Sequence, residues 1–292
     1  MLVAETWGKL SAIHKDPVEK KPLYHFYPGS SVLSIGSVGC NMKCRCCQNW
    51  QISQVSAGEY NFDREYEPRE IVSLAVNDPE NIGVAYTYNE PGMWFEFMLA
   101  TARIIHDSGL KNIVVSNGFI SDEPLGDLLP VIDAFNIDLK GFNREFYRTF
   151  TGSAIEPVLN SLKKIRLSGS HLEITCLIVP GLNDNRDEFA AMVSWIADEL
   201  GPATVLHLSR YHPAYKMGID STPANTLEDL FGLAQKKLNY LYAGNIRIKD
   251  FQDTKCHNCH NVVIKRVGYY TDRIAVTGEG LCKHCGTKVI VC

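Results

Sequence analysis

The most informative stretch of this sequence is Gly39-Cys40-Asn41-Met42-Lys43-Cys44-Arg45-Cys46-Cys47-Gln48-Asn49-Trp50. It follows residues 31–36, an apolar segment typical of a buried strand, and so it lies on the loop that leaves this strand. Cys40, Cys44 and Cys47 have the spacing C-x3-C-x2-C. Three crowded thiolates suit an iron–sulfur cluster better than a structural zinc ion, which normally takes four protein ligands. A four-iron cluster with three cysteine ligands keeps one iron open for chemistry. The alternatives are a structural metal knot and a chance group of buried thiols.

The composition is that of an ordinary globular protein. Of the 292 residues, 45% are apolar and 21% are charged, which is enough for a large core. No run of eighteen apolar residues occurs, so we expect no membrane span. The first residues show no basic segment followed by an apolar block, so we expect no secretory signal. Ten cysteines without such a signal favour metal binding in a reducing compartment, and we expect a cytoplasmic protein.

Strand and helix patterns alternate along most of the chain. After residues 31–36, strands are expected at 82–88, 112–116, 134–139, 172–179 and 204–209. Helices are expected at 68–77, 91–107, 156–167, 186–200 and 227–241. Six such units predict an α/β fold with a parallel sheet, because parallel neighbours need crossover connections. We expect a partial (β/α)6 TIM-like barrel over residues 31–250, after an N-terminal extension (1–30) with few regular patterns. An open doubly wound sheet is the alternative, since periodicity does not separate the two.

Polar residues follow the predicted strands at their carboxyl ends. In β/α barrels these ends meet at one mouth, where the active site lies. The cysteine loop follows the first strand, and the later strands are followed by Asn89 and Glu90, by Asn117, by Asp138 and Lys140, and by His212. We therefore expect these side chains to form one site.

The C-terminal residues 251–292 form a second cysteine pattern, C-x2-C…C-x2-C, made by Cys256, Cys259, Cys282 and Cys285. This spacing predicts a small zinc-ribbon-like module with short strands at 262–266 and 273–276. Four thiolates would close a tetrahedral Zn2+ shell, so the expected role is structural. A rubredoxin-like iron or an auxiliary cluster is the alternative. Residues 255–292 carry a net charge of +4 and the remainder −8, which permits an acidic partner or nucleic acid but equally a solvated basic face.

The cysteine loop resembles the motif of radical S-adenosylmethionine (SAM) enzymes, and the polar strand ends resemble that family's SAM contacts. The resemblance implies a [4Fe–4S] cluster on Cys40, Cys44 and Cys47, and reductive cleavage of SAM to a 5′-deoxyadenosyl radical that abstracts hydrogen from a substrate. It implies that Glu90 accepts the SAM amino group and that Lys140 faces the SAM carboxylate. It further implies SAM contacts from Asn89, Asn117, Asp138 and His212. The family usually has an aromatic residue where this chain has Cys46, so Cys46 competes with Cys47 as third ligand. We prefer Cys47 for its spacing.

Several segments resemble one branch of that family, the AmmeMemoRadiSam-system enzymes, which are similar to pyruvate formate-lyase activating enzyme. These segments are residues 16–29, 48–53, 86–91 and 211–217. Many members carry a further cysteine-bearing segment ahead of this point, so we expect a shorter member or a truncated chain. The resemblance implies a one-electron donor such as flavodoxin or ferredoxin, Memo-like and AMMECR-like partners, and a metabolite, protein or RNA substrate. Two other functions stay open: an activase for a glycyl-radical enzyme, and a non-enzymatic iron–sulfur or zinc protein that senses redox state or docks other proteins.

Overall fold

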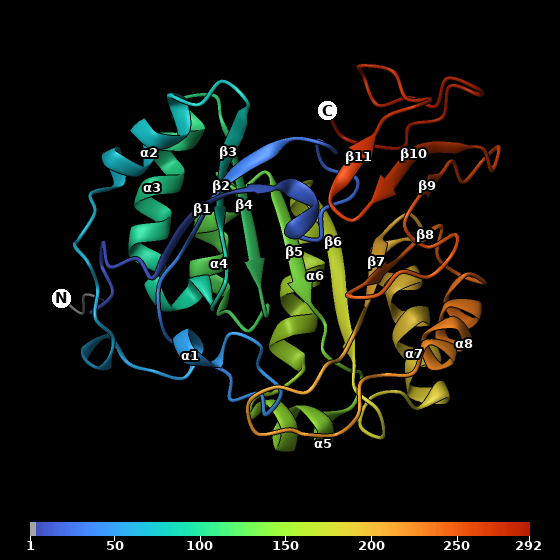
Figure 1. Cartoon of the computed structure of the whole chain (residues 1–292), viewed down its shortest axis with the longest axis horizontal. Helices are drawn as coiled ribbons and strands as arrows, with labels where there is room; N and C mark the ends of the chain where they lie inside the picture. The colour runs from blue at the N-terminus through green and yellow to red at the C-terminus, as the bar shows by residue number, and fades with distance from the viewer. Residues whose placement is uncertain (1–3) are drawn as a thin grey trace.

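A computed structural model describes residues 4–292, and within them the main sheet has eight strands (Figure 1). They are β1 (Ala12–Pro17), β2 (Ser31–Gly36), β3 (Asn81–Tyr86), β4 (Lys111–Ser116), β5 (Ala134–Asp138), β6 (His171–Ile178), β7 (Val205–Arg210) and β8 (Tyr240–Gly244). Their order in the sheet is their order in the chain. β1 pairs with β2 antiparallel, and β2 to β8 are all parallel. All seven parallel strands therefore end at one edge of the sheet.

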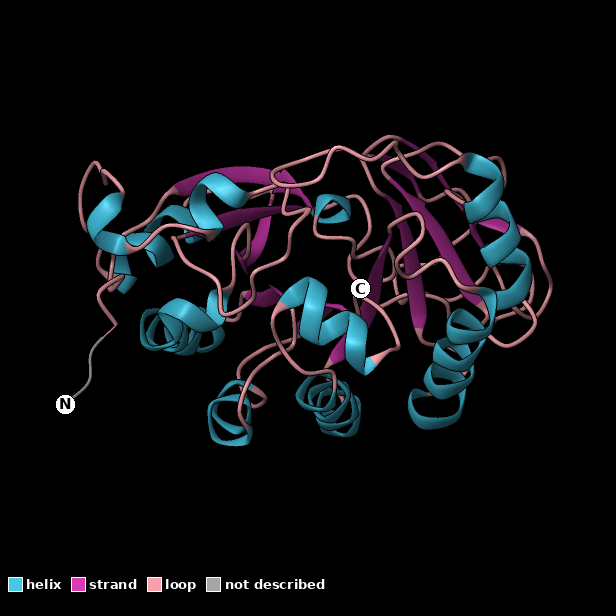
Figure 2. Cartoon of the chain, turned by 90° about the horizontal axis from the view of Figure 1, so that it is seen from below, coloured by secondary structure: helices cyan, strands magenta, loops and turns pink. Residues whose placement is uncertain are grey.

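This sequential order decides between the two architectures expected from the sequence. A doubly wound sheet reverses its strand order at a switch point, and this sheet does not. Most helices lie outside the curved sheet (Figure 2), with a large apolar cluster between, and the two shortest lie at the carboxyl ends of the strands (Figure 1). The helices are α1 (Trp50–Ser53), α2 (Pro68–Val76), α3 (Phe95–Asp107), α4 (Asp122–Leu128), α5 (Arg144–Phe146), α6 (Glu156–Ser168), α7 (Arg186–Trp195) and α8 (Ala224–Ala234). The predicted α/β partial barrel is confirmed, and no helix in residues 4–292 is long and apolar enough to cross a membrane.

The helix predicted at 227–241 was wrong at its C-terminal end. α8 stops at Ala234, and residues 240–244 form β8, which pairs with β7. The tyrosines at 240 and 242 favour a strand, but they also continue the apolar spacing of the helix. Pairing with β7 decided the outcome, and such pairing is not visible in local periodicity.

The N-terminal residues are more ordered than the sequence analysis expected. β1 forms a complete antiparallel ladder with β2, and the short 3-10 helix η1 (Val18–Lys20) follows it. We call residues 16–30 the strap, because they cross the concave face of the sheet in front of β5 and β6 (Figure 1). The side chain of Asn136 on β5 donates to Pro22 O at 2.8 Å. This contact joins residues 114 positions apart, so no local pattern predicts it.

A buried carboxylate fixes the strap to the sheet. Glu173 on β6 is fully buried and accepts hydrogen bonds from the backbone N of Tyr24 (3.0 Å) and of His25 (2.7 Å). His171 Nε2 lies 2.9 Å and His207 Nε2 lies 2.6 Å from the same carboxylate. Burial alone would raise the pKa of Glu173, but the two histidines outweigh it and hold the pKa well below its usual value. Glu173 is therefore an ionised anchor inside the barrel.

The C-terminal residues form a separate three-stranded sheet, in the order β11 (Tyr270–Asp272), β10 (Val262–Val267), β9 (Thr254–Lys255). The strand predicted at 262–266 is present as β10. The strand predicted at 273–276 is absent, and the chain forms β11 just before that segment. The module packs on the strap and on β8 through an apolar cluster of its own. The guanidinium of Arg266 is buried there, donates to Tyr24 O at 2.7 Å and lies over the Tyr24 ring.

Candidate functional site

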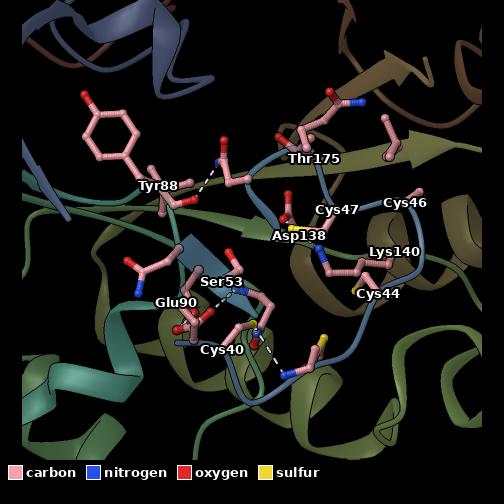
Figure 3. Close-up of a pocket in the computed structure, with 18 of the residues that line it drawn as sticks. Cys40, Cys44, Cys46, Cys47, Ser53, Tyr88, Glu90, Asp138, Lys140 and Thr175 are labelled. Atoms are coloured by element: carbon pink, nitrogen blue, oxygen red, sulfur yellow. Dashed lines mark hydrogen bonds and ion pairs between the residues drawn. The ribbon is translucent and has the colours of Figure 1, made fainter. Parts of the chain in front are cut away.

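The cysteine loop borders a cavity of about 570 Å3 at the carboxyl ends of the parallel strands (Figure 3). This volume is in the range of small-molecule sites. The loop reaches the cavity because β2, the first of the parallel strands, ends at Gly36 on the same edge as the others. Nine residues predicted from the sequence line it: Cys40, Cys44, Cys46, Cys47, Asn89, Glu90, Asn117, Asp138 and Lys140. The polar strand ends therefore do converge.

The thiols of Cys40, Cys44 and Cys47 surround the cavity without closing on one point. Within residues 4–292, no three His, Cys, Asp or Glu ligand atoms lie within 4.8 Å of one another except those of the C-terminal module. A four-iron cluster takes each thiolate on a different iron, so wider spacing suits a cluster and does not suit a single ion. Cys46 is only 5% exposed and belongs to the apolar core. Burial raises the pKa of Cys40 to about 12 and that of Cys46 to about 12, so both are neutral thiols at neutral pH, and Cys40 would lose its proton only on binding a metal.

Two asparagines hold the cysteine loop in place. Asn89 donates from Nδ2 to Gly39 O at 2.9 Å, and its Oδ1 accepts from Ser37 N at 3.3 Å. Asn117 donates to Asn41 Oδ1 at 2.8 Å and lies 3.6 Å from the Cys40 sulfur. The loop is thus tied to the ends of β3 and β4, which fixes the thiols relative to the sheet.

Glu90 is 4% exposed and lies beside Cys40 (Figure 3). Its Oε1 accepts from Gly92 N at 3.0 Å and from Ser116 Oγ at 2.8 Å, and its Oε2 accepts from Asn117 N at 2.9 Å. The carboxylate therefore caps the short helix η3 (Pro91–Trp94) and also faces the cavity. Burial raises the pKa of Glu90 despite these donors. A cation placed in the cavity would favour the ionised form, so Glu90 suits an ammonium group.

Asp138 and Lys140 leave the end of β5 on the same side, as the one-residue spacing between them predicts. Lys140 Nζ lies 2.8 Å from Asp138 Oδ2, and both side chains line the cavity between Cys44 and Cys47 (Figure 3). Burial disfavours the lysine charge, but the neighbouring carboxylate outweighs it, and the pKa of Lys140 is held well above its usual value. The site therefore offers a carboxylate at one end and a fixed ammonium at the other.

His212 lies beside the cavity but does not line it. Its ring nitrogens approach Ser221 Oγ at 3.0 Å and Asn245 O at 3.3 Å. Sequence reasoning missed two lining residues, Lys20 and Lys21, which belong to the strap. Thr175 and Ser209 were also missed. Polar residues at every second position of β6 and β7 (Glu173 and Thr175, His207 and Ser209) are the signal that could have revealed this polar interior.

The four C-terminal cysteines come together, as the sequence predicts. The Cys256 and Cys285 sulfurs are 3.5 Å apart, the Cys259 and Cys282 sulfurs 3.6 Å, and all four lie within 4.8 Å of one another. Zinc–sulfur bonds of about 2.3 Å in a tetrahedron place sulfurs about 3.8 Å apart. The set therefore fits one ion with a closed shell of four thiolates.

Comparison with known proteins identifies the class. The family model "Radical SAM superfamily" matches residues 34–196, more than half of the chain, and this protein belongs to that superfamily. It is accordingly a radical SAM enzyme, with a [4Fe–4S] cluster and SAM as the family's cofactors, and the non-enzymatic alternative is set aside.

Individual relatives narrow the position within the superfamily. The uncharacterized protein MJ0808 of Methanocaldococcus jannaschii is 42% identical over 294 residues, which cover 99% of this chain and 86% of MJ0808. Pyruvate formate-lyase 1-activating enzyme of Escherichia coli is 23% identical over 176 residues, 60% of this chain and 71% of that one.

Solved structures share the fold at low identity. A radical SAM methyltransferase from Sphaerobacter thermophilus aligns with a TM-score of 0.59 at 13% identity, over 78% of this chain and 70% of that one. Streptococcus suis SuiB bound to S-adenosylmethionine aligns with a TM-score of 0.56 at 12% identity, over 79% and 53% of the two chains.

Proposed function

We propose that Cys40, Cys44 and Cys47 hold a [4Fe–4S] cluster and that this protein cleaves SAM at the cavity beside it. One observation carries the proposal: the three loop thiols share a cavity with a buried carboxylate, Glu90, and a fixed cation, Lys140. When bound, the cluster supplies one electron to SAM, and the 5′-deoxyadenosyl radical that results takes a hydrogen atom from the substrate. The chain's own task is to hold SAM in one orientation and to limit access of water.

The two ends of the cavity match the two charged groups of the methionine part of SAM. Glu90 accepts a hydrogen bond from the ammonium group of SAM, and Lys140 faces the carboxylate of SAM. The ion pair with Asp138 orients the Lys140 side chain. Asn89 and Asn117 act mainly on the loop, through Gly39 and Asn41. The role of His212 near SAM stays a prediction, supported only by its place next to Asn245, a lining residue.

For the C-terminal module we propose a structural Zn2+ on Cys256, Cys259, Cys282 and Cys285, because a closed thiolate shell leaves no position for a substrate. The proposed modules keep the boundaries predicted from the sequence: residues 1–30, 31–250 and 251–292.

We also propose that the protein belongs to the AmmeMemoRadiSam branch and works in the cytoplasm. The motifs of residues 16–29, 48–53, 86–91 and 211–217 support this placement. A flavodoxin or ferredoxin would supply the electron, and Memo-like and AMMECR-like proteins are the proposed partners.

The decisive experiment is an anaerobic SAM-cleavage assay. Protein reconstituted with iron and sulfide is given SAM and a strong reductant, and 5′-deoxyadenosine is quantified for wild type, Cys44→Ala and the matched control Cys292→Ala. We expect product from wild type and Cys292→Ala and none from Cys44→Ala. Equal product from Cys44→Ala would refute the assignment of the loop. SAM binding to Lys140→Met, measured by equilibrium dialysis, should weaken at least tenfold, because a buried charge partner is lost.

A second candidate is an activase for a glycyl-radical enzyme, supported by the likeness to pyruvate formate-lyase 1-activating enzyme. Activase function would produce an organic radical signal on a partner protein after SAM cleavage. Absence of that signal with active protein and candidate partners from the same genome would favour a different substrate.

A further inference from the structure

We propose that the substrate of this enzyme carries an anionic group, carboxylate or phosphate, and that the strap binds this group through Lys20 and Lys21 beside a second cavity. This inference rests on the proposed function, because it places the substrate next to SAM. It concerns residues that have no part in the proposed SAM and metal contacts. Three features of the molecule carry it.

The first feature is a cluster of two lysines around one carboxylate. Asp16 accepts from Lys20 Nζ and from Lys21 Nζ, each at 2.8 Å, and from Tyr88 Oη at 2.6 Å. The Asp16 side chain is 6% exposed and that of Lys21 only 2%. One carboxylate thus pairs with two lysines, so the cluster carries one positive charge in excess at the cavity wall. Lys21 is buried, whereas the Lys20 side chain is 42% exposed, where a ligand can reach it.

The second feature is a cavity of about 490 Å3 that adjoins the first one. Lys20, Ser209 and Asn245 line both cavities, so the two meet at the strap. The strap, the segment after β8 and the C-terminal module form its walls. Within residues 4–292, two buried polar atoms of its lining have no hydrogen-bond partner, Glu19 Oε2 and Arg266 Nε. The second cavity therefore has a small-molecule volume and unused polar groups.

The third feature is the sign of the charge. The second cavity is lined by Lys20, Arg247 and Arg266 against the single acid Glu19. The first is lined by Lys20, Lys21 and Lys140 against Glu90 and Asp138. When Asp16, which pairs with Lys20 and Lys21, is counted, the first lining is balanced and the second keeps one positive charge in excess, although the whole chain carries −4. Such focused positive potential in a low-dielectric cavity attracts anions.

The protonation state of Lys21 agrees with this role. Burial lowers the pKa of Lys21 to about 8, although the hydrogen bond to Asp16 opposes the change. Lys21 is thus charged at neutral pH and loses its charge as the pH rises through about 8. The groups around it are Asp16, Lys20 and the Tyr88 ring, whose centroid lies 4.5 Å from Nζ. Anion binding should accordingly weaken above that pH.

The test uses reconstituted full-length protein with saturating SAM, so that Lys140 is already engaged. Inorganic phosphate and succinate are titrated separately by calorimetry, which distinguishes a phosphate from a carboxylate site. The variants are Lys20→Gln, Lys21→Gln and Arg247→Gln. Lys15→Gln is the matched control, because Lys15 lies on β1 outside both cavities and pairs with Asp78 and Glu80.

We expect at least one of the two anions to bind wild type and Lys15→Gln with equal affinity. The same anion should bind Lys20→Gln and Lys21→Gln at least fivefold more weakly. No binding to wild type, or equal binding to all variants, would overturn the inference. Lys20 is partly exposed, so Lys20→Gln keeps the test valid even if Lys21→Gln fails to fold. SAM binding is measured on the same samples. If wild type does not bind SAM, the proposed function is contradicted. If the variants still bind SAM and also bind the anion as well as wild type does, only this inference is contradicted.

Discussion

Cys40, Cys44 and Cys47 stand around an open cavity, whereas Cys256, Cys259, Cys282 and Cys285 close around one point. The first set lies on a loop held by asparagine side chains, next to a buried acid and a lysine. The second lies on two turns of the C-terminal module, with sulfur pairs at 3.5 and 3.6 Å. The difference teaches that cysteine spacing indicates metal binding, while the surroundings of the thiols indicate whether the metal can react.

The largest expected effect comes from removing one ligand of each set. Cys47→Ala should lose the iron of the reconstituted protein and reduce 5′-deoxyadenosine formation by at least a hundredfold, because an iron loses its anchor. Cys259→Ala should lose one equivalent of zinc but keep the iron, because its thiol serves the closed site. Metal analysis of both variants checks this. Loss of iron from Cys259→Ala would show that the two regions are not independent.

The strap anchor should give the next largest effect. Glu173→Gln replaces an ionised, fully buried acceptor of four hydrogen bonds, and it should lower the free energy of unfolding by about 3 kcal/mol. Because the pKa of Glu173 lies well below 4.5, its stabilising contribution is complete at neutral pH and declines as the pH falls below that value. Thermal unfolding from pH 7 downward measures both. Glu80→Gln, on the surface, is the control. If the stability of wild type changed with pH no more than that of Glu173→Gln, the role of Glu173 as an ionised anchor would be contradicted.

A smaller effect is expected from the loop clamp. Asn89→Ala removes two hydrogen bonds to the cysteine loop, which together contribute about 2 kcal/mol. We expect a reduction of about tenfold in the fraction of protein that retains its cluster during gel filtration. Asn160→Ala, on the outer surface, is the matched variant and should behave as wild type. Full cluster retention by Asn89→Ala would show that the loop needs no clamp.

The smallest effect is expected at Cys46. Its buried side chain packs in the core, so Cys46→Ala should cost about 1 kcal/mol of stability and leave the cluster in place. Visible absorbance and SAM cleavage should stay within twofold of wild type. Loss of the absorbance would instead make Cys46, not Cys47, the third ligand.

Local sequence patterns were enough for most of the barrel. Parallel strands are buried on both faces and read as apolar runs, and the helices between them carry apolar residues at helical spacing. The errors lie where a partner far along the chain decides the structure. Residues 240–244 form a strand because they pair with β7, and residues 12–17 form β1 because they pair with β2.

The residues of the candidate site also fall into those that local patterns predict and those that depend on distant parts of the chain. The polar strand ends Glu90, Asn117, Asp138 and Lys140 were predictable, because parallel strands must end at one edge. Lys20 and Lys21 were not, because their place depends on the path of the strap across the concave face. His212 follows its strand as expected, yet its ring is turned to Ser221 and Asn245.

By itself, the sequence determined the strand–helix alternation, both cysteine sets and the residues at the strand ends, because each depends on neighbours within a few positions. Only the tertiary structure decided how these parts meet. It brought Asp16 to Tyr88, His25 to Glu173 and Arg266 to Tyr24, over separations of 72, 148 and 242 residues. Such contacts are selected by burial and charge pairing in the folded chain, and they hold the strap, which borders both cavities.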